Sequence, residues 1–170
     1  MEKKVTSHIT KGLIISLILF VLDIIAGFAG LKYANWYKWV PAIIMFALLI
    51  WVCASYASQM NNNVTFGSVF GHGFKTSAVI ACLTVIFTLL SIFVIFPETK
   101  DIALDQARKQ MEAKGQLSED QIDKSIDITK RLFVPLAIIG IIVFTLLEGV
   151  VASLIGAAIV KKNPPTFENQ

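Results

Sequence analysis

The sequence predicts an all-α polytopic membrane protein, with four transmembrane helices and a polar helical hairpin between the third and the fourth. Of its 170 residues, 55% are hydrophobic, against roughly 45–50% in a soluble domain, and the mean hydropathy is +0.70. Crossing about 30 Å of hydrocarbon takes about 20 helical residues. Four apolar segments are long enough to do so, at residues 12–31, 39–57, 74–96 and 132–160.

The first apolar segment has one face of small and polar residues. On a helix drawn at about 100° per residue, these residues fall within about 60° of one another: Gly12, Ser16, Asp23, Gly27 and Gly30. We expect this face to contact protein rather than lipid. Because the segment is long and contains Asp23, we interpret it as a membrane span and not as a cleaved signal peptide.

The stretch between the first and third spans contains two local signals. Aromatic residues at 33–39 are typical of a membrane interface. Residues 64–73 form a short amphipathic piece, in which Phe66 and Phe70 are four residues apart and Thr65 is placed as an N-cap. We expect this piece to lie in the interface and to lead into the third span.

Four hydroxyl side chains share one face of the third span: Ser77, Thr84, Thr88 and Ser91. One interpretation is structural, in which the hydroxyls join neighbouring helices or bond back to a carbonyl one turn earlier. The other is a polar pathway through the membrane. The choice depends on what this face meets.

Residues 97–131 form the only long polar segment between the apolar ones, with eight acidic and seven basic residues. Gly115 separates two amphipathic stretches, and Ser118 with Gln121 has capping-box spacing. We expect two helices, the second of which continues into the fourth span. Their narrow apolar stripes would pack on each other, on the bundle or on a partner, unless the segment is only a solvated connector. The candidate partner surface is Ile122, Ile126 and Met111.

Small residues also gather on one side of the fourth span, where they allow another helix to approach closely. With the glycines of the first span, the candidate helix-packing face comprises Gly27, Gly30, Gly149, Ala152, Ser153 and Gly156. Two prolines begin the end of the chain, and we expect a disordered tail at 163–170.

Several short motifs occur together over nearly the whole chain. They are Phe66-Gly67 to Phe70, Gly73-Phe74-Lys75, Pro97-Glu98, Gly115 to Ser118-Glu119-Asp120-Gln121-Ile122, Gly149 to Ser153-Leu154-Ile155, and Lys161-Lys162. In this combination the chain resembles the small four-helix bacterial membrane proteins grouped as domain of unknown function family 4199. The resemblance implies a fold and a bacterial cell membrane. It implies no catalytic or binding residue.

Two carboxylates, Asp23 and Glu148, fall near the middle of the predicted first and fourth spans. An ionised Asp at the centre of a membrane helix costs about 2.5–3.5 kcal/mol, and no Lys or Arg lies within a predicted span to pair with either group. Each must be protonated, bonded to the hydroxyls of the third span, exposed to a water-filled cavity or matched by a partner. If the two spans are neighbours, the carboxylates could share a proton.

The sequence contains no motif that points to catalysis. It has no HExxH, no nucleophile–base constellation and no glycine-rich phosphate loop, so we expect neither an enzyme nor a cofactor, and no metal. The preferred interpretation is an accessory or assembly component that binds a membrane protein or a second copy of itself. The alternative is a small proton- or cation-linked transporter that uses Asp23 and Glu148. The net charge of +3 lies at span ends and in the hairpin, so we expect contact with the lipid bilayer and not with nucleic acid.

The orientation follows from the lysines and arginines. With both termini in the cytoplasm, six basic residues lie inside and nine outside, seven of the nine in the hairpin. A folded polar element is a poorer topology signal than a short loop, and three lysines precede the first span. We therefore expect a multi-pass protein of the bacterial cytoplasmic (inner) membrane, with its termini in the cytoplasm and its hairpin outside.

Overall fold

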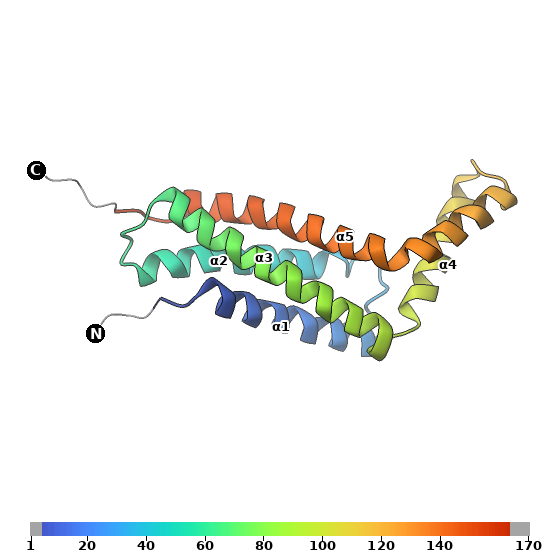
Figure 1. Ribbon diagram of the computed structural model, residues 1–170, viewed down its shortest axis with the longest axis horizontal. Helices are drawn as coiled ribbons and strands as arrows, with labels where there is room; N and C mark the ends of the chain where they lie inside the picture. Colours follow the sequence, from blue (N-terminus) through green and yellow to red (C-terminus); the bar gives the residue numbers. More distant parts are fainter. Residues whose placement is uncertain (1–4, 164–170) are drawn as a thin grey trace, which may run out of the picture. The chain divides into compact units, whose positions relative to one another are not determined.

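The computed structural model describes residues 5–163, which contain five α-helices and no strand (Figure 1). The helices are α1 (His8–Phe28), α2 (Trp39–Gln59), α3 (Phe66–Leu90), α4 (Thr99–Lys114) and α5 (Glu119–Ile159), and a π-helical segment, Ser91–Ile95, follows α3. The all-α prediction is therefore confirmed. The expected tail lies, apart from Asn163, outside the described residues.

Four helices are long and apolar enough to cross a membrane: α1, α2, α3 with its π-helical extension, and α5. No more than 28% of the apolar window of any of them is buried inside the protein. The remaining apolar surface needs a nonpolar surrounding, because apolar area in water costs about 25 cal/mol per Å². The prediction of four apolar spans is confirmed, and the fourth is the later part of the 41-residue helix α5.

The ends of α1 are set by local hydrogen bonds and by backbone conformation. The Ser7 side chain accepts a hydrogen bond from the N–H of Thr10 at 3.1 Å, which is an N-cap. The helix ends at Phe28, and Gly30 then has a φ of +70°. The helix therefore covers residues 8–28 instead of the expected 12–31.

The start of α3 has the N-cap that the sequence predicts. Thr65 Oγ1 accepts from the N–H of Ser68 at 3.2 Å, and Ser68 Oγ accepts from the N–H of Thr65 at 3.0 Å. From the next residue on, α3 is continuous, so residues 64–73 are not a separate element. The reason is packing: Val69 and Gly73 are buried within this stretch.

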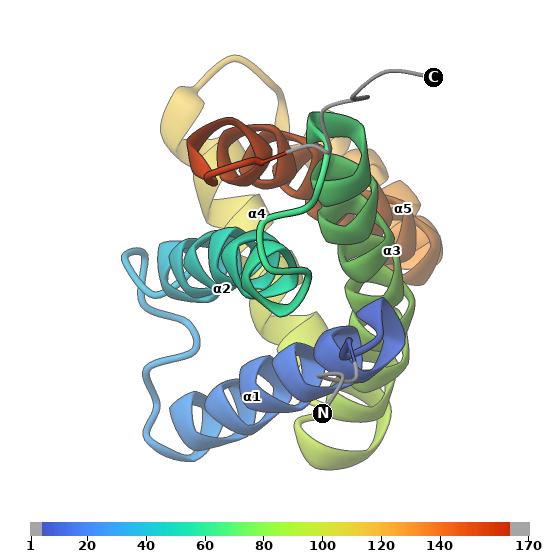
Figure 2. The ribbon, with the colours of Figure 1, turned by 90° about the vertical axis from the view of Figure 1, so that its left-hand side faces the viewer.

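The chain divides into two compact units, Met1–Thr84 with Ile142–Gln170 (unit 1) and Val85–Ile141 (unit 2). Unit 1 contains α1, α2, most of α3 and the last part of α5. Seen end-on, α2 and α3 lie between α1 and α5 (Figure 2). The core is formed by two clusters of buried side chains: Ile15, Met45, Leu49, Val52, Ile80 and Ala152, and Cys53, Ala57, Val64, Val69 and Ala157.

Small residues bring α2, α3 and α5 close together in unit 1. A Cβ atom at Gly73 would lie 2.7 Å from Cys53 Sγ on α2 and 2.6 Å from Ser153 Oγ on α5. A Cβ atom at Gly156 would lie 2.7 Å from Cys53 Cβ. At Gly149 it would overlap the Ser77 side chain. These distances leave no room for any side chain larger than hydrogen.

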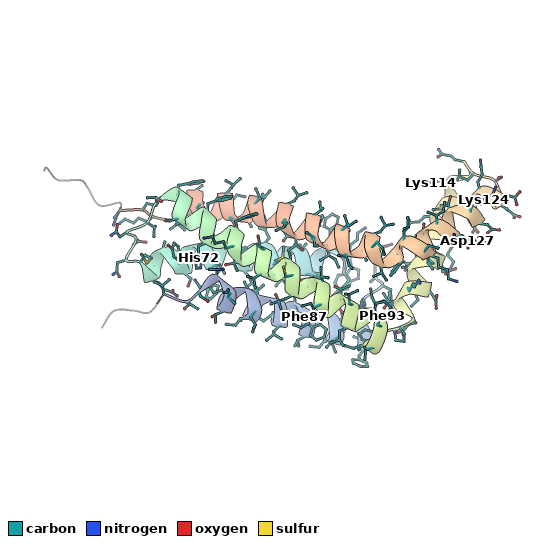
Figure 3. The ribbon with its side chains drawn as sticks, in the orientation of Figure 1. His72, Phe87, Phe93, Lys114, Lys124 and Asp127 are labelled. Atoms are coloured by element: carbon teal, nitrogen blue, oxygen red, sulfur yellow. The ribbon has the colours of Figure 1, made fainter. Side chains whose placement is uncertain are left out.

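Unit 2 contains the end of α3, all of α4 and the first part of α5. Gly115, with a φ of +61°, ends α4, and Gln121 Oε1 accepts from the N–H of Ser118 at 3.0 Å before α5. Leu104 and Ile122 are buried in this unit, each less than 10% exposed. An exposed ion pair between Arg108 and Asp123 joins the two helices. Figure 3 labels three charged side chains on the helices that flank this turn: Lys114, Lys124 and Asp127.

Candidate functional site

Asp23 is ion-paired with Lys32, whose Nζ lies 2.8 Å from Oδ2 of the carboxylate. The side chain of Lys32 is 14% exposed and that of Asp23 31%, so solvent screens the pair only in part. Asp23 lies five residues before Phe28, the last residue of α1. Asp23 is therefore nearer the end of its helix than the expected middle, and the cation that pairs with it lies just beyond the predicted span 12–31.

A reversal of the chain after α1 creates this ion pair. Gly30 has a left-handed conformation that glycine adopts without strain, and the N–H of Leu31 donates to the carbonyl of Ala26 at 2.9 Å. Along a continuous helix, nine residues would separate the Cα atoms of Asp23 and Lys32 by about 13.5 Å, too far for an ion pair. The sequence signal was Gly30 itself, because glycine often follows the last residue of a helix.

Tyr37 covers the same end of α1. Its hydroxyl donates to the carbonyl of Leu22 at 3.1 Å, and the residue is 9% exposed. Burial raises the pKa of Tyr37 above its ordinary value of 10.0, and the negative charge of Asp23 raises it further. This end of α1 therefore holds an ion pair and, near it, a phenol that is satisfied by a backbone carbonyl.

Glu148 has different surroundings. It lines a groove of about 440 Å³ between α2 and α5, whose other lining residues are apolar: Ala42, Ile43, Phe46, Phe144, Leu147 and Val151. One oxygen of the carboxylate, Oε1, is buried and has no hydrogen-bond partner among the described residues. No described lysine or arginine forms an ion pair with Glu148.

The two carboxylates are not brought together. Asp23 is on α1 and Glu148 is on α5, and α2 and α3 lie between these helices in unit 1 (Figure 2). A proton shared by the two groups required the first and fourth spans to be neighbours, and this condition is not met.

The hydroxyl face of α3 contacts helix backbone and small residues. Ser77 is fully buried, donates to the carbonyl of Phe74 at 2.8 Å and lies against Gly149 of α5. Thr84 is half-buried in unit 1. The two remaining hydroxyls belong to unit 2, where Thr88 is half-buried and Ser91 is buried. Of the two hydroxyls of this face that belong to unit 1, the buried one, Ser77, therefore donates to a carbonyl of its own helix.

The predicted packing and partner surfaces lie as follows. In unit 1, the four small residues of α5 are buried: Gly149, Ala152, Ser153 and Gly156. On α1, Gly27 is half-buried, and Gly30 lies beyond the helix with no atom within 4 Å of where its Cβ would be. In unit 2, Ile122 is buried, whereas Ile126 and Met111 are half-buried. Ile122 is thus the least exposed of the three residues predicted to form a partner surface.

A cluster of polar residues that sequence reasoning missed lies in unit 1, on α1, α2 and α3. The ring of His72, labelled in Figure 3, stacks on Tyr56 at 4.2 Å between centroids and meets the edge of His8 at 6.1 Å. A cavity of about 280 Å³ is lined by these rings and by Ser68 and Lys75. The Nε2 atom of His72 is buried and lacks a partner among residues 5–163. The chemistry available here is hydrogen bonding and positive charge.

Residues 5–163 contain no group of three or more His, Cys, Asp or Glu side chains that could hold a metal ion. The two cysteines are free, Cys53 buried and Cys82 exposed. What the arrangement offers is hydrogen-bond acceptance at Glu148, hydrogen bonding at the histidines and positive charge at the lysines of unit 1.

These features define a helical protein with four helices able to cross a membrane and with a single carboxylate in a groove between two of them. The family described as protein of unknown function (DUF4199) matches residues 10–162, and the chain belongs to it. The family resemblance noted from the motifs is therefore confirmed. No curated protein and no solved structure matches the chain.

Proposed function

We propose that the protein is an accessory component of the bacterial cytoplasmic membrane, without catalytic activity, that assembles with another membrane protein at the groove that contains Glu148. One observation carries the proposal. This carboxylate lines an apolar groove between two spans, with one oxygen that no described residue satisfies.

The energetics favour a partner that donates a hydrogen bond. A buried acceptor without a donor costs about 1–3 kcal/mol, and helices in lipid associate through packing and interhelical hydrogen bonds. Ile43 and Leu147 on the walls of the groove are more than 60% exposed, so a helix can pack there. The terminal torsion of a glutamate is broad, so its oxygens can turn towards the groove.

The chemistry of the groove favours a different protein over a second copy of this chain. A symmetric dimer through this groove would bring two Glu148 carboxylates together, and like charges repel. A partner helix with an apolar face and a lysine, arginine or amide side chain at the same depth would instead satisfy the acceptor.

The distribution of charge supports cytoplasmic termini. The basic residues near the start of α1 and the end of α5 include Lys11, Lys161 and Lys162, and Asn163 bonds to Asn62 in the connection between α2 and α3. The described acidic residues of unit 1 are Asp23 and Glu148 alone, neither of which lies near these basic residues in the sequence. Because lysines beside a membrane span tend to stay in the cytoplasm, these lysines would place both termini there. Residues 97–131 would then form a polar hairpin on the outer face, three spans from the N-terminus.

The transporter alternative has less support. It relied on two intramembrane carboxylates, and Asp23 is occupied by Lys32. Glu148 would have to exchange protons or cations alone, in a groove whose other lining residues are apolar.

Site-specific photo-crosslinking in intact cells tests the assembly. A crosslinker at Leu147, in the groove, should give one discrete protein adduct. The matched control is Ile25, which is similarly exposed on α1 (58% against 62%) but outside the groove. Glu148→Leu should reduce the Leu147 adduct about tenfold, since the loss of one interhelical hydrogen bond is worth about 1–2 kcal/mol.

The outcomes separate the two functions. Crosslinks from Leu147 to lipid alone, or an adduct unchanged by Glu148→Leu, would reject the assembly proposal. Proton or cation flux in proteoliposomes that Glu148→Gln abolishes, with the protein still folded, would support the transporter instead.

A further inference from the structure

Lys11 is buried in unit 1, at only 4% exposure, although it lies in the first turns of α1. Its Nζ donates to Ser55 Oγ at 3.2 Å and lies 3.5 Å from the carbonyl oxygen of Val52. An ammonium group has three donors. None of the ion pairs of the described residues includes Lys11. The charge is therefore removed from water without an anion of residues 5–163 paired with it.

A lysine in this position is costly. Removing an ammonium group from water costs several kcal/mol even after relaxation, and neutral acceptors offset only part of that cost. The groups that Lys11 Nζ contacts, the Ser55 hydroxyl and the Val52 carbonyl, are both neutral. An anion from outside the chain would satisfy this site.

A cavity of about 510 Å³ lies against Lys11, between α1 and α2. Its polar lining residues are near one end of the two helices and include Lys11, Ser55 and Gln59. Its apolar lining residues lie further along both helices and include Ile14, Ile18 and Trp51. Because α1 and α2 are antiparallel, the start of α1 lies beside the end of α2. The cavity is therefore polar at this end and apolar further along both helices.

We propose that this cavity binds an anionic glycerophospholipid, with the phosphate at Lys11 and one acyl chain along the groove between α1 and α2. The order of polar and apolar groups matches that of a phospholipid in a bilayer, from headgroup to chain. A soluble anion would leave the apolar part of the cavity unfilled. The site is independent of the function proposed above, since it lies between α1 and α2 while Glu148 lies between α2 and α5.

Trp51 provides a direct probe of this site. The chain has three tryptophans, and replacing Trp36 and Trp39 by Phe leaves Trp51 alone at the cavity. In detergent micelles, phosphatidylglycerol with brominated acyl chains should quench Trp51 at about a tenfold lower mole fraction than brominated phosphatidylcholine, a preference worth about 1.4 kcal/mol. Inorganic phosphate should not compete, since it lacks the chain.

Variants of Lys11 establish the role of its charge. Lys11→Met should abolish the preference for phosphatidylglycerol, and Lys11→Arg should retain it. The control Lys161→Met, at an exposed lysine after α5, should leave it unchanged. If Lys11→Met does not fold, Ile18→Phe keeps the charge and narrows the apolar part of the cavity, and it should weaken quenching by phosphatidylglycerol.

Three results would overturn the proposal. They are equal quenching of Trp51 by the two brominated lipids in the protein with native Lys11, an unchanged preference in folded Lys11→Met, and unchanged quenching in Ile18→Phe. Competition by inorganic phosphate alone would show that the site takes a soluble anion and not a lipid.

Discussion

Two largely buried lysines lie at opposite ends of α1. Lys11 is in the first turns of the helix, and Lys32 lies just beyond its last residue. Lys32 has a carboxylate 2.8 Å away, supplied by the same helix through a reversal of the chain. Lys11 has a hydroxyl and a carbonyl, and no anion of the described chain. The difference shows that one charge is balanced within the fold and the other is not.

The comparison extends to Glu148, which is the acidic counterpart of Lys11. Each is an ionisable residue in a helix able to cross a membrane, and each lines its own cavity in unit 1. A charge that the fold balances is a structural element, whereas a charge that the fold leaves unbalanced indicates an external ligand or partner. This reasoning is why the contacts proposed for Lys11 and Glu148 are with molecules outside the chain, whereas Asp23 is paired within it.

The largest effect is expected on removing the partner of Lys32. Asp23→Leu removes the carboxylate that is paired with Lys32, and loss of one member of a fully buried pair costs about 3–5 kcal/mol. Because Asp23 is 31% exposed, we expect about 2 kcal/mol, measured by reversible unfolding in mixed micelles. The double variant Asp23→Leu with Lys32→Leu should recover most of this loss. Additive losses in the double variant would show that the two groups do not act as a pair.

In lipid-free detergent, Lys11→Met should not lower the folding stability as Asp23→Leu does. Replacing a buried charge that lacks a counterion with an apolar side chain of similar length should leave stability unchanged or raise it by about 1–2 kcal/mol. The matched control is Lys32→Met, which removes the ion pair with Asp23 and should lower stability. A loss in Lys11→Met as large as in Lys32→Met would remove the distinction between the two lysines.

A smaller effect is expected for an ion pair that is open to water. The pair between Arg108 and Asp123 in unit 2 has side chains that are 43% and 61% exposed. Exposed pairs contribute about 0.2–1 kcal/mol, so Arg108→Ala should cost no more than this. The cost should also shrink in 1 M salt. A loss comparable to that of Asp23→Leu would mean that burial does not account for the difference between the pairs.

The smallest effect concerns Tyr37 and appears only at high pH. Its pKa is raised in the folded state by burial and by Asp23, so folding retains the proton more tightly than the unfolded chain does. The stabilisation is fully present below pH 10 and is lost as the pH rises through the folded-state pKa. Tyr37→Phe should remove this part of the loss in an unfolding titration from pH 9 to 11. Identical pH profiles for the two proteins would contradict the assignment.

Much of the fold was accessible from local patterns. Thr65 caps α3 because its hydroxyl needs only the N–H three residues later, and Gly115 ends α4 because glycine adopts a positive φ readily. The continuation of the polar stretch into the last apolar segment as one helix, α5, was also predicted. These features depend on neighbours within a few residues, which sequence patterns record.

The site was less predictable, since its contacts join residues distant in the sequence. Lys11 precedes the expected start of the first span at Gly12, so it counted only as a topology signal. The cap at Ser7 moves the start of α1 earlier, and contact with Val52 and Ser55, more than 40 residues away, buries the lysine. Ile122 was assigned to a partner surface because its spacing does not reveal that it is buried.

The number of spans, their apolar character and most helix caps follow from the order of residues, because chain length against bilayer thickness and local hydrogen bonding set them. The pairing of Asp23 with Lys32, the burial of Lys11 and the side on which Glu148 lies depend on where each helix ends and which helices are adjacent. A helical pattern defines a face but not its neighbour. The packing of α1, α2, α3 and α5 therefore determines which charges are balanced within the protein and which remain for a lipid or a partner.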